Sequence, residues 1–193
     1  MIRRTLIAAF LAAAALPAFA QLTIAGESFE GQASVAGSKL LLNGVGLRAV
    51  AWIKGYAAGL YMTQKAAEPA QAMAMAGAKR IRLRMMMEAP TEEFVKAIDK
   101  GIGRNMPESA QAGLAERRER FNAQVRAVGK VKKGDVVDLD FVPERGLVFS
   151  YNGKAQGEPI PGADFYAAVM SIFLGDKPVD KKLKAGLLGE PPA

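Results

Sequence analysis

The hydrophobic period of this sequence changes at Pro90, and this change restricts the folds that the chain can adopt. Residues 79–87, KRIRLRMMM, alternate between apolar and basic side chains, which is the pattern of a strand with one buried face. After Pro90, Phe94, Ile98 and Ile102 recur at every fourth residue, which is the spacing of a helical stripe. Strands and helices must therefore pack in one core.

The same comparison of periods along the chain predicts the order of the elements. Strands are predicted within 21–42, 46–62, 79–87, 137–141 and 147–151, and Asn152-Gly153 predicts a type I′ hairpin turn. Helices are predicted within 67–78, from Thr91 as N-cap to about Gly103, from 107–109 to Val128, from 163 to Gly175, and from Asp180 onward. This order predicts an α+β fold, in which helices cover one face of an antiparallel sheet and a cleft can form between the two layers.

The N-terminal sequence MIRRTLIAAFLAAAALPAFAQ has the parts of a secretory signal peptide. Arg3 and Arg4 precede an apolar stretch, and Ala18-Phe19-Ala20 is a typical cleavage site. We expect cleavage after Ala20, which leaves residues 21–193 as one periplasmic or secreted domain. The apolar stretch is short for a membrane span, and we expect no integral membrane segment after cleavage. The chain has no Cys, so a lipid anchor on an N-terminal cysteine and disulfide bonds are both excluded.

The charge of the chain does not indicate a nucleic-acid partner. Removal of Arg3 and Arg4 with residues 1–20, which contain no acid, lowers the formal charge from +7 to +5. The arginines within 115–126 alternate with Glu116 and Glu119, as on a solvated helix face. We expect a monomer that binds no nucleic acid, and a weak attraction to anionic membrane surfaces is compatible with this charge.

The absence of His and Cys excludes several kinds of chemistry. Neither Ser-His-Asp nor Cys-His catalysis is possible within this chain, and the usual zinc ligands are missing. Residues 101–105, GIGRN, lack the Lys-Ser/Thr of a phosphate-binding loop, so we predict no metal and no cofactor. Asp138 and Asp140 share one face of a predicted strand, where they form either an acid/base pair or, as we prefer, the outer face of a hairpin.

Arg48 is the unusual residue of the segment NGVGLRAVAWIKGYAAGLYM, which is otherwise small or apolar. If residues 46–62 form one strand, Arg48 shares a face with Trp52 and Tyr56, but a bulge expected at Gly55 would turn Tyr56 to the other face. A guanidinium among apolar neighbours needs a partner, which is either a carboxylate of this protein or an anionic ligand. The residue pattern alone favours the internal carboxylate.

Several segments, in their order along the chain, resemble the bacterial exported branch of the chalcone isomerase-like family. They are GVGLR, GLYM, KRIRLRMM, the helix start TEEF, the hairpin GDVVDLDFVPERGLVFSYNG and the ending FLGDKPVDKKLKAGLLG. The resemblance covers nearly all of residues 21–193. The G-x-G-x-R strand and LGDKPVD…LLG are its most specific parts.

The resemblance implies an open-faced sandwich, with a large antiparallel sheet, a layer of helices and a ligand cleft between them. Plant members close a flavonoid ring, and an arginine that matches Arg48 stabilises the developing enolate in those enzymes. Related plant members bind fatty acids, and the equivalent arginine holds the carboxylate. Tyr56, Phe94 and Gly101 stand where the isomerases carry an active-site threonine, tyrosine and asparagine. The departures disfavour an isomerase, because Phe94 can neither donate nor accept a hydrogen bond.

Three functions therefore remain as hypotheses. The first is an exported, non-catalytic protein that binds a small apolar or fatty-acid-like carboxylate, with Arg48, Trp52, Tyr56 and Phe94 as ligand-binding residues. The second is an isomerase, an intramolecular lyase acting on a chalcone-like substrate, with Arg48 as its catalytic residue. The third is a structural or interaction protein of the cell envelope, whose cleft is filled by its own side chains.

Overall fold

The computed structural model of the chain describes residues 21–191. The strands are β1 (Leu22–Ile24), β2 (Glu27–Phe29), β3 (Gln32–Val35), β4 (Ser38–Val50), β5 (Ile53–Met62), β6 (Lys79–Met85), β7 (Ala89–Pro90), β8 (Lys130–Val131), β9 (Val136–Val142), β10 (Gly146–Tyr151) and β11 (Lys154–Ala155). The helices are α1 (Pro69–Ala74), α2 (Thr91–Asn105), α3 (Glu108–Val128), α4 (Ala163–Leu174) and α5 (Lys181–Leu187). The predicted signal peptide, residues 1–20, lies outside the described residues. No helix within 21–191 is long and apolar enough to cross a membrane.

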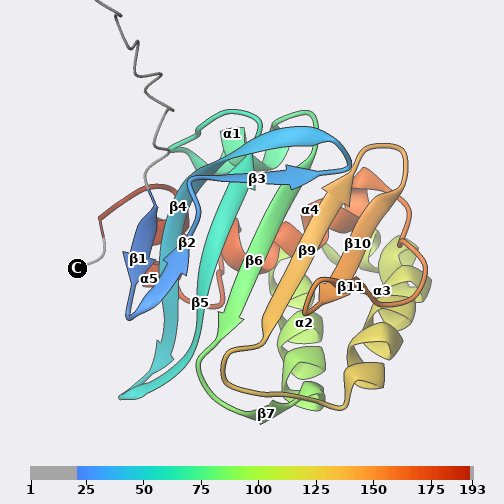
Figure 1. Cartoon of the computed structure of the whole chain (residues 1–193). Helices are drawn as coiled ribbons and strands as arrows, with labels where there is room; N and C mark the ends of the chain where they lie inside the picture. Colours follow the sequence, from blue (N-terminus) through green and yellow to red (C-terminus); the bar gives the residue numbers. More distant parts are fainter. Residues whose placement is uncertain (1–20, 192–193) are drawn as a thin grey trace, which may run out of the picture.

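One antiparallel sheet organises the described part of the molecule. Its strands follow the order β11-β10-β9-β6-β5-β4-β3, and each neighbouring pair is antiparallel (Figure 1). Asn152 and Gly153 both have positive φ, 48° and 78°, as the predicted type I′ turn between β10 and β11 requires. The α+β fold predicted from the order of periods is confirmed.

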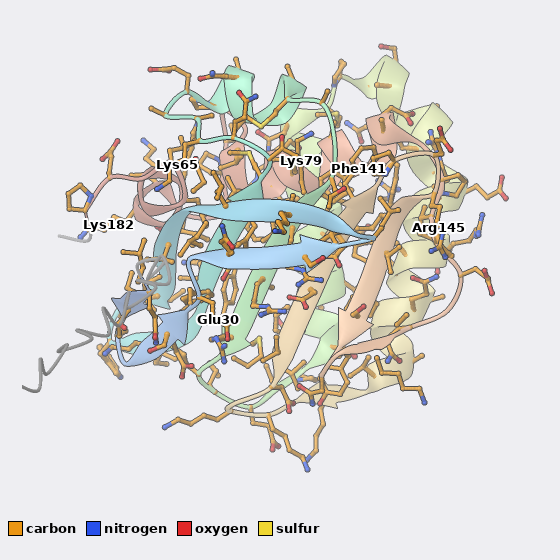
Figure 2. All side chains as sticks on the ribbon, turned by 45° about the horizontal axis from the view of Figure 1, so that its top comes forward. Glu30, Lys65, Lys79, Phe141, Arg145 and Lys182 are labelled. Carbon is orange, nitrogen blue, oxygen red and sulfur yellow. The ribbon has the colours of Figure 1, made fainter. Side chains whose placement is uncertain are left out.

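The helices cover one face of this sheet and bury the main core (Figure 1). The alternation of β6 places Ile81, Leu83 and Met85 on that face, as predicted, and α4 is buried along most of its length. Lys79 shares the face and is also buried, with Nζ 5.5 Å from the centre of the Phe141 ring (Figure 2).

The opposite face is covered in part by the chain before β4. The sheet curls, so that β3 at its edge contacts β9, and Phe29, Leu40 and Tyr61 are buried in a second, smaller core (Figure 1). Asp138 and Asp140 lie on this side and are only 4% and 6% exposed. The prediction that they form the outer face of a hairpin was wrong about their exposure, because the curl depends on contacts between distant segments.

Helix α5 lies directly against the backbone of β4. An added Cβ on Gly44 would stand 2.2 Å from the carbonyl oxygen of Gly186, and one on Gly46 would stand 2.5 Å from that of Leu183. Asn43 strengthens the contact, since its side chain donates to the carbonyl oxygens of Ala66 and Leu187 at 2.9 and 2.8 Å. The glycines of the G-x-G-x-R segment thus allow the C-terminal helix to approach the sheet closely.

Candidate functional site

The site is built on the hairpin of β4 and β5. Val50 pairs with Ile53, so Ala51 and Trp52 form a turn, and the single continuous strand predicted over 46–62 was wrong. The predicted bulge at Gly55 is confirmed, because the register shifts there between the pairs Arg48–Tyr56 and Ala49–Lys54. Arg48 and Tyr56 are therefore direct cross-strand neighbours.

A cavity of about 250 Å³ lies between the sheet and the helices beside this pair. Its lining is almost entirely apolar and includes Leu83, Met85, Phe94 and Phe173. The volume is near the lower end of small-molecule sites, which are roughly 300–1,000 Å³. The cleft expected between the two layers therefore exists, and it is not filled by the protein's own side chains.

Most polar side chains of the lining are already engaged. Thr91 Oγ1 donates to the carbonyl oxygen of Gly129 at 3.0 Å. Thr91 was predicted to be the N-cap of α2, but it is the first residue of the helix and Pro90 is the N-cap. Glu93 pairs with Lys96 at 2.7 Å, and the Tyr151 hydroxyl donates to Asp135 at 2.5 Å. Donors for a ligand can come only from Arg48 and Tyr56 among the described side chains of the lining.

Arg48 has one internal carboxylate partner. Its Nη1 donates to Asp180 Oδ2 at 3.2 Å and to the carbonyl oxygen of Ala49 at 2.9 Å. The other guanidinium nitrogens, Nε and Nη2, form no hydrogen bond within residues 21–191. The side chain is 27% exposed and lies at the edge of the cavity, so the internal carboxylate partner that the residue pattern favoured is present and part of the guanidinium stays accessible.

Asp180 is positioned by the start of α5. The helix was predicted to start at Asp180, and Asp180 is its N-cap: its Oδ1 accepts from the backbone N–H groups of Lys182 and Leu183 at 2.8 and 3.0 Å. Its other oxygen, Oδ2, faces Arg48. The sequence indicated that a helix starts here but gave no local signal for the contact with Arg48.

Tyr56 presents a neutral phenol to the cavity. Burial raises its pKa, although the nearby Arg48 guanidinium acts in the opposite direction. The hydroxyl forms no hydrogen bond with the described residues. A ligand oxygen placed between Tyr56 and Arg48 would receive hydrogen bonds from both.

Phe94 and Gly101 stand at two of the positions where the isomerases carry polar side chains. Phe94 lines it and is partly buried, so this position supplies surface and no hydroxyl. Gly101 is buried, and a Cβ on it would stand 2.8 Å from Cγ1 of Ile172, which also lines the cavity. Ile172 thus occupies the space that a side chain at position 101 would need.

Trp52 does not belong to the cavity. It lies in the turn between β4 and β5 and is 88% exposed. The expectation that it shares a strand face with Arg48 was wrong, because the chain reverses at Ala51 and Trp52. The residues that complete the cavity come from helices α3 and α4, such as Val125, Val169 and Phe173, and their apolar spacing did not distinguish cavity from core.

A metal site is not formed by the described part of the chain. Within residues 21–191, no group of three or more Asp and Glu side chains is placed to hold a metal ion, and the chain has no His or Cys.

Comparisons with known proteins agree with this geometry. A sequence model described as Chalcone isomerase-like matches residues 20–189. The structure resembles the crystal structure of a fatty-acid binding protein of Arabidopsis thaliana, AtFAP1, with a TM-score of 0.69 and 18% identity over 88% of this chain and 96% of that one. No curated protein matches the chain in sequence. The extent of the family match shows that the chain belongs to the chalcone isomerase-like family.

Proposed function

We propose that this protein is an exported, non-catalytic binding protein that holds a small apolar or fatty-acid-like carboxylate in the cavity beside Arg48. The observation that carries the proposal is the composition of the lining, in which Arg48 and Tyr56 supply the available donors and nearly every other side chain is apolar. Such a site suits a ligand with one anionic end and an apolar body. The similarity of the fold to a fatty-acid binding protein supports the same class of ligand.

The geometry suggests how a carboxylate would be held. Asp180 fixes Nη1 of Arg48, which leaves Nε and Nη2 for one or both ligand oxygens. The Tyr56 hydroxyl can donate to the same carboxylate. The apolar tail would then lie along Leu83, Met85 and Phe94.

Two positions weigh against the isomerase alternative. Phe94 has no hydroxyl with which to position a substrate, and Ile172 fills the space beside Gly101. Arg48 and Tyr56 give a site that can bind an anion. The carboxylate beside them, Asp180, is already engaged by Arg48 and by the backbone N–H groups at the start of α5.

Export is supported by the signal-peptide pattern of residues 1–20, and we propose a periplasmic or secreted location. Analysis of the N-terminal residue of the protein purified from the periplasm or medium tests it. Gln21 at the N-terminus is the expected result, and a cytoplasmic protein that retains residues 1–20 would contradict it.

The binding proposal is tested with fatty acids of increasing length and their methyl esters. Native mass spectrometry reports any bound ligand, and thermal unfolding reports binding, because a ligand of the native state alone raises stability. We expect Arg48→Ala to weaken binding of the acids by about tenfold or more, since a hydrogen bond to a charged group contributes about 1.5–3 kcal/mol. The esters should bind both proteins alike.

The matched control is Arg145→Ala. Arg145 is exposed at the turn between β9 and β10, away from the cavity lining (Figure 2). This variant should bind the acids as the unaltered protein does. If Arg48→Ala binds the fatty acids as tightly as the control, Arg48 is not the carboxylate partner and the proposal fails.

A further inference from the structure

The tip of the β4–β5 hairpin exposes large apolar side chains to solvent. Val50, Trp52 and Ile53 are 61%, 88% and 49% exposed, and Trp52 is the only tryptophan of the chain. No described residue covers them. Adjacent exposed side chains of this kind mark an interaction site more often than isolated ones do.

The residues of this turn are poorly suited to the backbone conformation that they adopt. Ala51 has φ of 52° at the first position of a two-residue hairpin turn, where glycine is usual. Trp52 follows it with 88% of its surface exposed, so packing against the described residues does not explain an aromatic residue here. A local sequence that opposes the stability of its own turn indicates selection for another property.

Three exposed lysines lie at the same end of the sheet as the apolar tip, and one of them is next to it. Lys54 is exposed next to it. Met86 N–H donates to the carbonyl oxygen of Gly55, and Gly134 N–H donates to that of Met85, so the turn of 132–135 lies at the same end of the strands. That turn carries Lys132 and Lys133, both exposed and without an ion pair among the described residues.

The acids at this end are largely neutralised. Glu88 pairs with Lys130 at 3.1 Å, Glu92 with Arg126 at 3.2 Å and Glu93 with Lys96 at 2.7 Å. The Asp135 carboxylate accepts hydrogen bonds from Tyr151, Asn152 and the backbone N–H of Lys132. This end of the sheet therefore presents an apolar tip next to Lys54, with Lys132 and Lys133 on a turn at the same end.

The cavity reaches the same edge. Arg48, Gly55 and Met87 line it, and Met87 is 38% exposed. The hairpin tip and the charged end of the cavity thus lie a few residues apart on β4 and β5.

We propose that the tip formed by Val50, Trp52 and Ile53 docks into the surface of an anionic lipid bilayer, with Lys54, Lys132 and Lys133 above the lipid headgroups. A tryptophan has an apolar ring and one N–H donor, which suits the boundary between headgroups and acyl chains. Lysines near that boundary are attracted to anionic lipids. A convex turn bearing so few apolar side chains is too small for the buried centre of a stable protein interface.

Docking in this orientation would turn the edge of the cavity toward the lipid. The ligand could then pass between bilayer and cavity over a short path. This last step rests on the proposed function, whereas docking itself does not.

Trp52 provides its own spectroscopic probe. The purified protein is titrated with vesicles of zwitterionic lipid alone and with vesicles that also contain an anionic lipid. We expect a blue shift of tryptophan fluorescence on the anionic vesicles only, which decreases as salt is added. Fluorescence that remains that of a water-exposed indole on anionic vesicles would overturn the proposal.

Co-sedimentation with the anionic vesicles tests the residues. We expect Trp52→Ser with Ile53→Ser, and separately Lys132→Glu with Lys133→Glu, to weaken binding by about tenfold or more. Lys65→Glu is the matched control, because Lys65 is exposed beyond the opposite end of β5 (Figure 2). Equal binding by the tip variant and the control would overturn the proposal, because binding would then depend on another part of the chain.

Fatty-acid binding without vesicles separates this proposal from the previous one. The tip variant should keep the fatty-acid affinity of the unaltered protein, since Trp52 does not line the cavity. Loss of vesicle binding with fatty-acid binding intact is the expected result. If neither protein binds fatty acids while the vesicle results hold, the proposed function fails and the docking surface stands.

Discussion

Arg48 and Asp180 are 132 residues apart in the sequence, yet Nη1 of one lies 3.2 Å from Oδ2 of the other. The contact depends on how α5 lies on β4. Gly44 and Gly46 precede Arg48 on the same strand face and leave room for the helix, and Gly186 does the same from the helix side. The two segments that most specify the family resemblance are thus packed against each other, and their contact places a carboxylate beside the candidate ligand-binding arginine.

Asp180→Asn should strengthen fatty-acid binding. The change removes a negative charge that competes with the ligand for Arg48, while asparagine retains the N-cap of α5. We expect the stability to fall by no more than about 1 kcal/mol, the usual limit for a partly exposed ion pair. Calorimetric titration and urea unfolding measure the two effects.

Asp180→Ala, compared with Asp180→Asn, separates the effect of the charge of Asp180 from the effect of its N-cap hydrogen bonds. It also frees Arg48, but it costs about 1 kcal/mol more because the N–H groups of Lys182 and Leu183 lose their acceptor. Weaker ligand binding in the asparagine variant would indicate that Asp180 is required to orient Arg48, and that its charge does not compete.

Most helices and strands, and the arginine of the candidate site, could be predicted from the sequence. The long-range contacts of these elements and of Arg48 could not. Alternation and helical spacing depend on nearest neighbours along the chain, so the strand of 79–87 and the helix ending at Val128 were predicted correctly. The turn at Ala51 and Trp52 was missed because it contains none of the Gly, Asn, Asp or Pro residues that mark turns.

Long-range contacts account for the remaining differences. Asp138 and Asp140 were assigned to the correct kind of alternating strand, but the curl of the sheet that buries them comes from β3, which lies far away in the sequence. The apolar residues of α3 and α4 were predicted to recur at helical spacing, and such spacing is the same for a packed core and for a cavity lining. Whether such residues surround a cavity depends on how closely two layers approach, which no local pattern encodes.

Gly101→Ala should destabilise the protein even though alanine is the better helix former. The new Cβ would stand 2.8 Å from Ile172, and crowding of this kind typically costs about 1–3 kcal/mol. Gly113→Ala is the control in α3, where nothing lies within 4 Å of the added Cβ. It should stabilise by up to about 1 kcal/mol through helix propensity. Urea unfolding measures the stability of both variants. If Gly101→Ala is stabilised, the side chain of Ile172 moves aside at no cost and the predicted crowding is contradicted.

Asp138→Asn should cost more stability than any change to a surface ion pair. Arg82 donates to both oxygens of Asp138 at 2.7 Å, and Arg80 donates to both oxygens of Asp140 at 2.6 Å beside it. Removal of the Asp138 charge takes from Arg82 its bidentate partner, and because Arg82 is 22% exposed the cost should be at most about 3–5 kcal/mol, the range for breaking a buried pair. Chemical denaturation measures the loss of stability. The control is Lys96→Gln, which breaks an exposed ion pair and should change stability little. Equal effects of both variants would contradict the assigned burial.

The four tyrosines of the chain should make the fold sensitive to alkali. Burial raises the pKa of Tyr61 to about 12, against its ordinary value of 10.0, and also raises the pKa of Tyr56 and Tyr166. The hydrogen bond to Asp135, together with burial, raises the pKa of Tyr151 to about 12.

An unfolded chain ionises these phenols near their ordinary pKa, whereas the folded chain holds their protons to a higher pH. Their contribution to stability is therefore complete below pH 10.0 and is lost as the pH rises toward about 12. We expect tyrosinate absorbance to appear together with the loss of circular dichroism, in one cooperative transition. A tyrosine that ionises near its ordinary pKa while the dichroism remains native would contradict its burial. If the early absorbance is missing in Tyr56→Phe, the tyrosine that ionises early is Tyr56, which lines the cavity.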